Sequence, residues 1–381
     1  MSIVLAIIAL SILVFFHEIG HFISAKISGV KVEEFGFGYP PRIFGVLRKD
    51  KKNYFFWRKK IPEKAKNTTI YSLNFIPFGG FNKLKGEAGE SKESDSFEKQ
   101  KWYKKVFVSS SGALMNLVLA FFVFFACFLY GMPQVIEEGM RGKLLQEVGV
   151  QIVMVMPNSP AEKAGLKNGD VIVKINEKEI ISSEGAQKEI HLQKEKQKIK
   201  LTLRRGREII EKEAEVLPIS QIFPEVKENY GAIGISLAQI GIVRYSLLEA
   251  IVNSFKTTVS LTAQLFYGLW LILKYLFIKR EMIGQLVGPI GITAMMGQAA
   301  RIGFSYFLQL VGLLSMAIGL CQLIPFPALD GFRVLTSFLE GIRKKPIKPQ
   351  VEATIINLGF FLLLFLMIFI TSKEIIGLIR I

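Results

Sequence analysis

The fold of this chain follows from its first apolar stretch, IVLAIIALSILVFFHEIGH, residues 3–21. No charged side chain occurs from Ile3 to Phe16, and two histidines and a glutamate then follow within five residues. Together with the next few residues, this run is long enough to cross the hydrocarbon core of a bilayer. Ionisable side chains are costly inside a membrane, so we expect His17, Glu18 and His21 to serve a function.

The spacing of these three residues predicts a metal site. Residues four apart lie on one face of a helix, so the imidazoles of His17 and His21 can reach the same ion. Glu18 lies beside that ion and can take a proton from metal-bound water. The pattern H-E-x-x-H also occurs by chance in soluble helices, but its place in an apolar span favours one Zn²⁺ per chain. The remaining histidine, His191, lies in a Lys- and Glu-rich stretch that is typical of a solvated surface.

Composition indicates a membrane protein that crosses the bilayer several times. Half of the 381 residues are hydrophobic, and 31 are phenylalanine. Four segments are long and apolar enough to span the membrane, residues 3–25, 106–130, 304–325 and 354–371. The first lacks the basic start of a signal peptide, so we expect it to be retained as a span.

The distribution of charge predicts the orientation in the plasma (inner) membrane. Between residues 26 and 105 basic side chains outnumber acidic ones about two to one, and residues 331–349 are also basic, which assigns both loops to the cytoplasm. An even number of spans must separate the two loops. A further apolar segment, about residues 257–277, contains Gln264 and Lys274, and we expect it to be an amphipathic helix on the outer surface. The N-terminus and residues 131–302 are then extracytoplasmic.

A third zinc ligand is expected in the stretch PFPALDG, residues 325–331, at the inner end of the third span. Two histidines and one water leave zinc one protein ligand short. A carboxylate at Asp330 would be expensive at the membrane edge unless it were paired or bound to a cation. Spans one and three run in the same direction, so Asp330 and His17 lie at similar depth, near the cytoplasmic side. The alternative is a simple turn that ends the helix at the interface.

HEIGH together with PFPALDG resembles the site-2 protease family of intramembrane zinc metalloproteases, and the bacterial regulator of sigma-E protease branch is most similar. Three further stretches resemble elements of that family, SGALMN at 111–116, PFGGF at 77–81 with Lys83, and VGPIGI at 287–292.

The resemblance implies roles for individual residues. It implies that His17, His21 and Asp330 bind zinc and that Glu18 is the catalytic acid and base. Candidates for positioning the substrate are Asn116, Gln322, Gly79 and Gly80. The family usually has Asn eight residues before the ligand aspartate, where this chain has Gln322. That departure puts the substrate-positioning role of Gln322 in question. It does not affect the expected metal ligands.

A second resemblance concerns the extracytoplasmic region. The run SPAEKAGLKNGD, residues 159–170, is similar to the PDZ domains of bacterial envelope proteases. Strands expected at 152–155, 171–175, 199–203 and 208–216 complete one such domain, at about residues 148–218. PDZ domains bind extended peptides by strand addition and often capture peptide termini. The alternative is a domain that filters substrates by size and binds none.

On the cytoplasmic side, residues 31–85 are rich in Phe, Tyr and Gly. Alternating stretches at 32–37, 53–57 and 68–75 suggest a small sheet at the inner membrane face. The resemblance implies that this sheet engages an unwound substrate, and the alternative is a membrane-associated linker.

The expected fold is therefore a polytopic α-helical membrane protein with four transmembrane helices, an inserted extracytoplasmic PDZ domain and a small cytoplasmic β element. In chain order we expect the first span at 1–30, the cytoplasmic β region and loop at 31–105, and the second span at 106–130. The extracytoplasmic region follows at 131–245, the amphipathic helix and its linker at 246–302, and the third span at 303–331. A cytoplasmic loop at 332–353 leads to the fourth span and tail at 354–381.

Charge and cysteine content exclude other classes of protein. The net charge is +16, and the basic residues are concentrated where the anionic inner leaflet would attract them. No aromatic-basic recognition module accompanies them, so we expect no nucleic-acid partner. Cys127 and Cys321 lie in apolar spans, and we expect both to be buried free thiols.

These observations predict hydrolysis of peptide bonds in transmembrane segments of single-pass membrane proteins or signal peptides. Cleavage of an anti-sigma factor and clearance of signal-peptide remnants both fit. The alternatives are a catalytically inactive PDZ scaffold and a membrane metal transporter. The transporter would not need Glu18.

Overall fold

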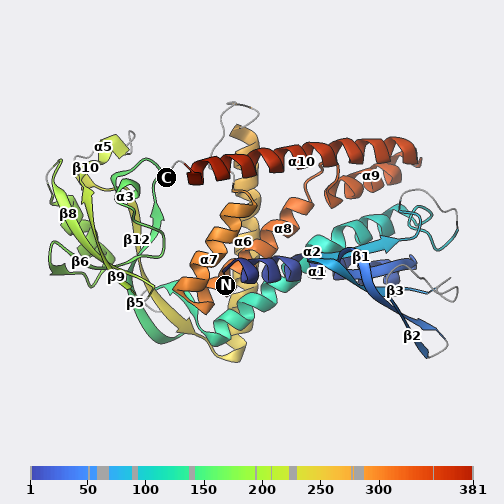
Figure 1. Ribbon diagram of the computed structural model, residues 1–381, viewed down its shortest axis with the longest axis horizontal. Coiled ribbons are helices and arrows are strands. Elements are labelled where there is room, and N and C mark those ends of the chain that lie inside the picture. Colours follow the sequence, from blue (N-terminus) through green and yellow to red (C-terminus); the bar gives the residue numbers. More distant parts are fainter. Residues whose placement is uncertain are drawn as a thin grey trace. The chain divides into compact units, whose positions relative to one another are not determined.

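The computed structural model describes residues 2–49, 52–57, 68–87, 93–136, 142–193, 195–206, 208–222, 230–275, 278, 287–345 and 347–379 (Figure 1). The chain forms two compact units. One comprises Met1–Phe124, Phe255–Gln298 and Leu310–Ile381, and the other comprises Phe125–Ser254 with Ala299–Gln309.

Four helices of the described residues are long and apolar enough to cross a membrane. They are α1 (Ser2–Ser28), α2 (Trp102–Tyr130), α8 (Phe304–Gln322) and α10 (Pro349–Ile379). Helix α6 (Leu247–Lys274) does not qualify as a span, although its outer-surface position stays a prediction and residues 276 and 277 lie outside the described residues. Cys127 is buried as expected, whereas the prediction for Cys321 was wrong, because this residue lies on an exposed face at the end of α8.

Helices α1 and α2 approach each other closely because small residues line their contact. A Cβ at Gly20 would lie 2.9 Å from Met115 Cβ and still closer to the carbonyl oxygen of Ser111, so only glycine fits there. The hydroxyls of Ser24 and Ser111 also meet across this contact, 2.6 Å apart. The close approach brings the face of α1 that carries His17 and His21 against α2.

A three-stranded antiparallel sheet packs beside α1 (Figure 1). Its strands β1 (Val32–Lys49), β2 (Lys52–Trp57) and β3 (Ile70–Leu84) lie in the order β2-β1-β3. Ser11 of α1 donates a hydrogen bond to the carbonyl of Pro77 (2.7 Å), and Asn82 donates one to the carbonyl of Glu18 (3.0 Å). The stretches expected to form a sheet therefore do so, and hydrogen bonds hold β3 beside α1.

The third membrane helix ends in an irregular turn that leads to α9 (Asp330–Arg343). Pro325 and Pro327 cannot continue a helix because each lacks a backbone N–H. Helix α10 packs tightly against this turn, since a Cβ at Gly359 would lie 2.5 Å from the carbonyl oxygen of Pro327. Near the other end of α10, Glu374 accepts hydrogen bonds from three backbone amides at the start of α7 (Pro289–Ile302).

The second unit contains an antiparallel sheet in the order β4-β12-β5-β6-β8-β9, and β7 pairs with β6. The strands are β4 (Met132–Val135), β5 (Lys143–Val155), β6 (Val171–Ile175), β7 (Lys178–Glu179), β8 (Lys198–Arg205), β9 (Glu208–Glu215) and β12 (Ile235–Arg244). The remaining elements are α3 (Pro160–Lys163), α4 (Ser183–His191), α5 (Ile219–Ile222) and the short pair β10 (Leu217–Pro218) and β11 (Gly231–Ala232). Fully buried aliphatic side chains of β5, β6 and β8 form its core.

A buried ion pair fixes the glycine-rich turn after α3. The Asp170 side chain is about 1% exposed and accepts two hydrogen bonds from Arg205, both of 2.7 Å. It also accepts a hydrogen bond from the amide of Lys167 (2.8 Å). Arg205 donates both of these hydrogen bonds to Asp170, and they raise the pKa of Arg205 above its ordinary value.

The substitution Asp170→Asn should destabilise this unit, because a neutral amide cannot accept all of these bonds and leaves buried donors unpaired. We expect a loss of about 2 kcal/mol. Hydrogen exchange of β6 and β8 amides in the full-length chain should then accelerate about 30-fold. Glu213→Gln, at an exposed position of β9, is the matched control and should leave exchange unchanged. Native exchange rates in Asp170→Asn would contradict this account.

Candidate metal centre

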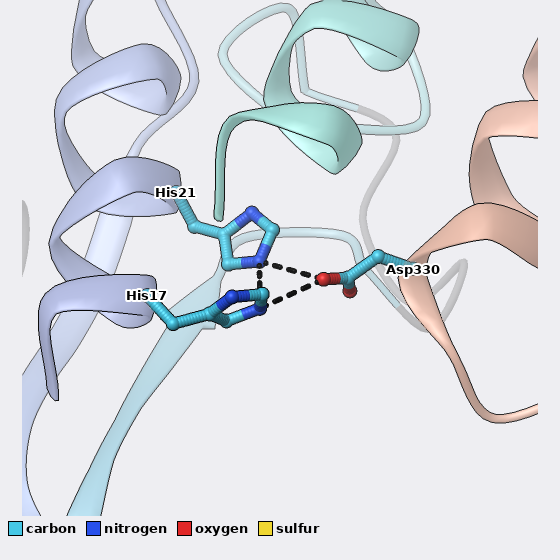
Figure 2. A group of neighbouring side chains, drawn as sticks. All are labelled: His17, His21 and Asp330. Carbon is cyan, nitrogen blue, oxygen red and sulfur yellow. Dashed lines mark hydrogen bonds and ion pairs between the residues drawn. The ribbon is translucent and has the colours of Figure 1, made fainter. Parts of the chain in front are cut away.

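Two histidines of α1 and one aspartate at the start of α9 converge on a single point (Figure 2). His17 Nε2 lies 2.9 Å and His21 Nε2 lies 3.1 Å from Asp330 Oδ2. The two Nε2 atoms are 3.2 Å apart. Ligands of a tetrahedral zinc ion, each about 2.0–2.2 Å from the metal, lie about 3.3 Å from one another. The three separations are therefore close to, and slightly shorter than, those around such an ion.

The irregular turn after α8 directs the Asp330 carboxylate toward α1. Gly331 must be glycine, since a Cβ there would overlap the carbonyl oxygens of Leu323 and Ile324. Ala328 adopts a left-handed backbone conformation (φ 77°), which L-residues rarely do. Helix α9 is held in turn to α2, because Lys105 Nζ donates to Glu340 Oε2 (2.8 Å). Asp330 is therefore placed by packing on both sides.

Helix α2 leaves space where the ligand atoms converge. A Cβ at Gly112 would lie 2.6 Å from His17 Nε2 and even closer to His21 Nε2. Any side chain at this position would therefore press on both candidate ligand nitrogens. Two imidazoles and a carboxylate are a donor set that zinc prefers, so the three side chains that converge beside Gly112 fit a bound metal ion.

The second nitrogen of His21 has a hydrogen-bond partner of its own. His21 Nδ1 lies 2.8 Å from the carbonyl oxygen of Val108 on α2. This acceptor places the ring proton on Nδ1 and leaves the lone pair of Nε2 for a metal. His21 is therefore both oriented and held in the tautomer that binds zinc.

Glu18 shares a cavity of about 190 Å³ with His17, His21 and Asp330. The other lining residues are Phe81, Asn82, Leu84, Glu87, Phe97, Val108, Ser109, Gln322, Ala328 and Arg333. Arg333 and Glu87, which both line this cavity, form an ion pair with each other. The cavity thus gathers a potential proton acceptor, the three candidate ligands and room for a substrate group.

Ionisable groups outside the membrane helices support the walls of the site. Burial raises the pKa of Tyr39 above its ordinary value, and the nearby Glu18 carboxylate raises it further, so this phenol stays protonated. Lys85, at the end of the β3 region, donates hydrogen bonds to Asp95 and Glu93, and these bonds raise the pKa of Lys85. The same contact lowers the pKa of Asp95. These bonds tie β3 to the segment that carries Phe97.

The residues expected to position the substrate lie at different places. Gln322 lines the cavity, and its buried Oε1 has no hydrogen-bond partner among the described residues. Gly79 and Gly80 pack against α1, and a Cβ at Gly80 would lie 3.7 Å from Glu18 Cγ. Asn116 is fully buried behind His17 and does not line the cavity.

Sequence reasoning did not assign Gly112, Arg333 or Glu87 to the site. Gly112 offered a signal, because it lies one helical turn before Asn116 in an apolar span. Arg333 is a basic residue one turn after Asp330, which also singles it out. Glu87 gave no signal, since it belongs to a polar loop rich in similar residues.

Comparisons with known proteins agree with this geometry. The profile of Peptidase family M50 matches residues 5–58 and 55–366. A protein of Clostridium perfringens that is named as a zinc metalloprotease is 33% identical over 99% of both chains. A Clostridium acetobutylicum protein with the same designation is 30% identical over 98% of this chain and 97% of its own length. Zinc metalloprotease RasP of Shouchella clausii is 26% identical over 98% of this chain and 99% of its own length.

Among solved structures, the PDZ domains of SdrC-like proteins from Listeria monocytogenes and Listeria innocua match 23% of this chain. Both are 26% identical with a TM-score of 0.21, and the match covers 86% and 92% of the two domains. The family match spans most of the sequence, including the candidate metal centre. The chain therefore belongs to peptidase family M50, the site-2 protease family of zinc metalloproteases.

Proposed function

We propose that this protein hydrolyses peptide bonds within the transmembrane segments of membrane-protein substrates. The observation that carries the proposal is the convergence of His17, His21 and Asp330 beside Glu18, with both histidines on a helix apolar enough to span a bilayer. A proteolytic site at this position meets its substrate in the plane of the membrane.

The same convergence supports the proposed topology. His17 lies in the second half of α1, and Asp330 lies just beyond α8, so the two helices bring their C-terminal ends to the same depth. An even number of crossings between the basic loops satisfies this requirement. We therefore place the metal site near the cytoplasm, and the N-terminus and the domain at about 148–218 outside it.

In the mechanism, bound zinc would lower the pKa of a coordinated water toward about 7 and polarise the scissile carbonyl. Within this chain, His17, His21 and Asp330 would hold the metal. The contacts of Asp330 with the two histidines also connect α9 to α1. Glu18 accepts the proton of the attacking water and then passes it to the departing amide nitrogen. The cavity offers room for the scissile carbonyl beside Glu18.

A helical substrate must unwind locally before its carbonyls are accessible, so helix-breaking residues should favour cleavage. The first half of β3, Ile70–Leu73, pairs with β1 on both edges. Among the described residues, the second half, Gly80–Leu84, pairs with β1 on one edge and with no strand on the other. An unwound segment could pair with that edge, close to Gly79, Gly80 and Glu18. Single-pass proteins and signal peptides fit this site, and peptide termini fit the PDZ domain.

Removal and return of zinc test the proposed function. Purified protein in detergent should cleave a single-pass substrate inside its transmembrane segment, as located by mass spectrometry of the fragments. A strong chelator should abolish cleavage, and stoichiometric Zn²⁺ should restore it, while Mg²⁺ should not, since magnesium favours oxygen ligands over imidazole. A chain that binds one zinc and cleaves no membrane substrate would instead be a scaffold or a metal carrier.

A further inference from the structure

Asn116 is buried directly behind one of the candidate zinc ligands. Its side chain is fully shielded from solvent, and its Nδ2 lies 3.4 Å from His17 Nδ1. The residue does not line the cavity that contains Glu18, so it is screened from a substrate there. Its contact is with the imidazole.

The packing around Asn116 leaves its side chain little room to move away. Ser315 Oγ of α8 donates a hydrogen bond of 2.8 Å to the Asn116 backbone carbonyl. Helix α8 comes close enough that a Cβ at Gly319 would lie 3.1 Å from Asn116 Cβ. These contacts hold the backbone and Cβ of Asn116 beside α8, and the carboxamide lies next to His17.

One atom of this carboxamide is unsatisfied. Asn116 Oδ1 is buried and has no hydrogen-bond partner among the described residues. A buried polar atom without a partner costs about 1–3 kcal/mol. The oxygen and nitrogen of an amide are assigned from their hydrogen bonds, and a half-turn exchanges them.

The chemistry of a metal-bound histidine identifies the missing partner. An imidazole that offers its Nε2 lone pair to zinc keeps its proton on Nδ1 and needs an acceptor there. At His21 the acceptor is the carbonyl of Val108. At His17 a half-turn of the Asn116 amide would place Oδ1 against Nδ1–H, so the oxygen gains a donor and Nδ2 takes the position that Oδ1 now holds.

We propose that Asn116 is a positioning residue that accepts the Nδ1 proton of His17 and so holds this ligand in its zinc-binding tautomer. The proposal rests on the zinc site of the proposed function, and it replaces the expectation that Asn116 positions the substrate. Val108, Gly112 and Asn116 follow one another at intervals of four residues, so one face of α2 supplies an acceptor, the space for the ion and a second acceptor.

Zinc affinity of the full-length protein, measured by chelator competition without substrate, tests the proposal. Asn116→Leu retains a similar shape and removes the acceptor, and it should weaken zinc binding 10–100-fold. Asn116→Asp keeps an acceptor oxygen at the same place, so its affinity should remain within a few-fold of native. In the Co²⁺-substituted protein, the visible absorption band should shift in Asn116→Leu and stay closer to native in Asn116→Asp.

Ser315→Ala is the packing control, because it removes the α8 hydrogen bond to Asn116 and leaves the carboxamide in place. It should lower the melting temperature without a comparable loss of zinc. If Asn116→Leu does not fold, Asn116→Ala decides the question and should show the same 10–100-fold loss. Native zinc affinity in a folded variant that lacks the acceptor would overturn the proposal, as would an equal loss in Asn116→Asp.

These outcomes are separate from those for proteolysis. A native chain that binds one zinc but cleaves nothing would end the protease proposal and leave the role of Asn116 standing. If the native chain cleaves its substrate and the Asn116 variants bind zinc with native affinity, the protease proposal stands and the role of Asn116 is wrong.

Discussion

Glu18→Gln should abolish peptide hydrolysis while the protein still binds one zinc ion. The carboxamide is nearly the same size as the carboxylate but cannot accept the proton of the attacking water. General-base catalysis by a positioned side chain contributes about 10²–10⁴-fold, so we expect a loss of at least that order in kcat. Cleavage of a membrane substrate and zinc content should be measured on the same preparation.

The matched control for this variant is Glu33→Gln, which neutralises a glutamate of β1 paired with Lys83 at the surface (3.0 Å). Its activity should stay near native, because Glu33 does not line the metal cavity. Retained turnover in Glu18→Gln would remove Glu18 from the mechanism. Loss of zinc together with activity would make Glu18 a determinant of the metal site.

Gly112→Ala should weaken zinc binding strongly. The added Cβ would lie 2.6 Å from His17 Nε2 and closer still to His21 Nε2, so the ligand nitrogens and the methyl group cannot keep these positions. Alanine is a better helix former than glycine by about 1 kcal/mol, so helix propensity would favour the variant. We therefore expect about a 100-fold loss of affinity, the upper end of the range that disturbed support around a metal site produces.

Gly268→Ala in α6 provides the control, because a Cβ there meets no atom within 4 Å. That variant should bind zinc and cleave substrate as the native protein does. Zinc affinity measured by chelator competition distinguishes the two glycines. Native affinity in Gly112→Ala would mean that α2 does not border the bound ion.

Local pattern was enough to predict the chemistry of the site. The spacing of His17 and His21 brings both rings to one face of any helix, whatever surrounds it. The cost of a carboxylate at the membrane edge singled out Asp330, and the structure brings it to 2.9 Å from His17. The four apolar segments were recognisable because spanning a bilayer imposes length and hydropathy on a continuous stretch.

Contacts between distant segments were not predictable in this way. Strand β12 pairs with β5 in the sheet of the second unit, and Ile235 lies opposite Val155, some 80 residues earlier. No turn motif in the sequence predicts this pairing, because the two strands are so far apart along the chain. Helix α4 was not foreseen because Ser183–His191 reads as a polar stretch, and only two of its side chains, Ala186 and Ile190, are buried. The side of the membrane on which each part lies stays a prediction.

The sequence by itself determined the metal-binding residue types, their helical spacing and the apolar spans, since each of these depends on neighbours along the chain. Tertiary structure alone decided that Gly112 leaves room for an ion, that Val108 accepts from His21 and that Asn116 lies behind His17. Those roles arise where α1, α2 and α8 approach within a few ångströms. Such an approach depends on the packing of whole helices, which no local run of residues encodes.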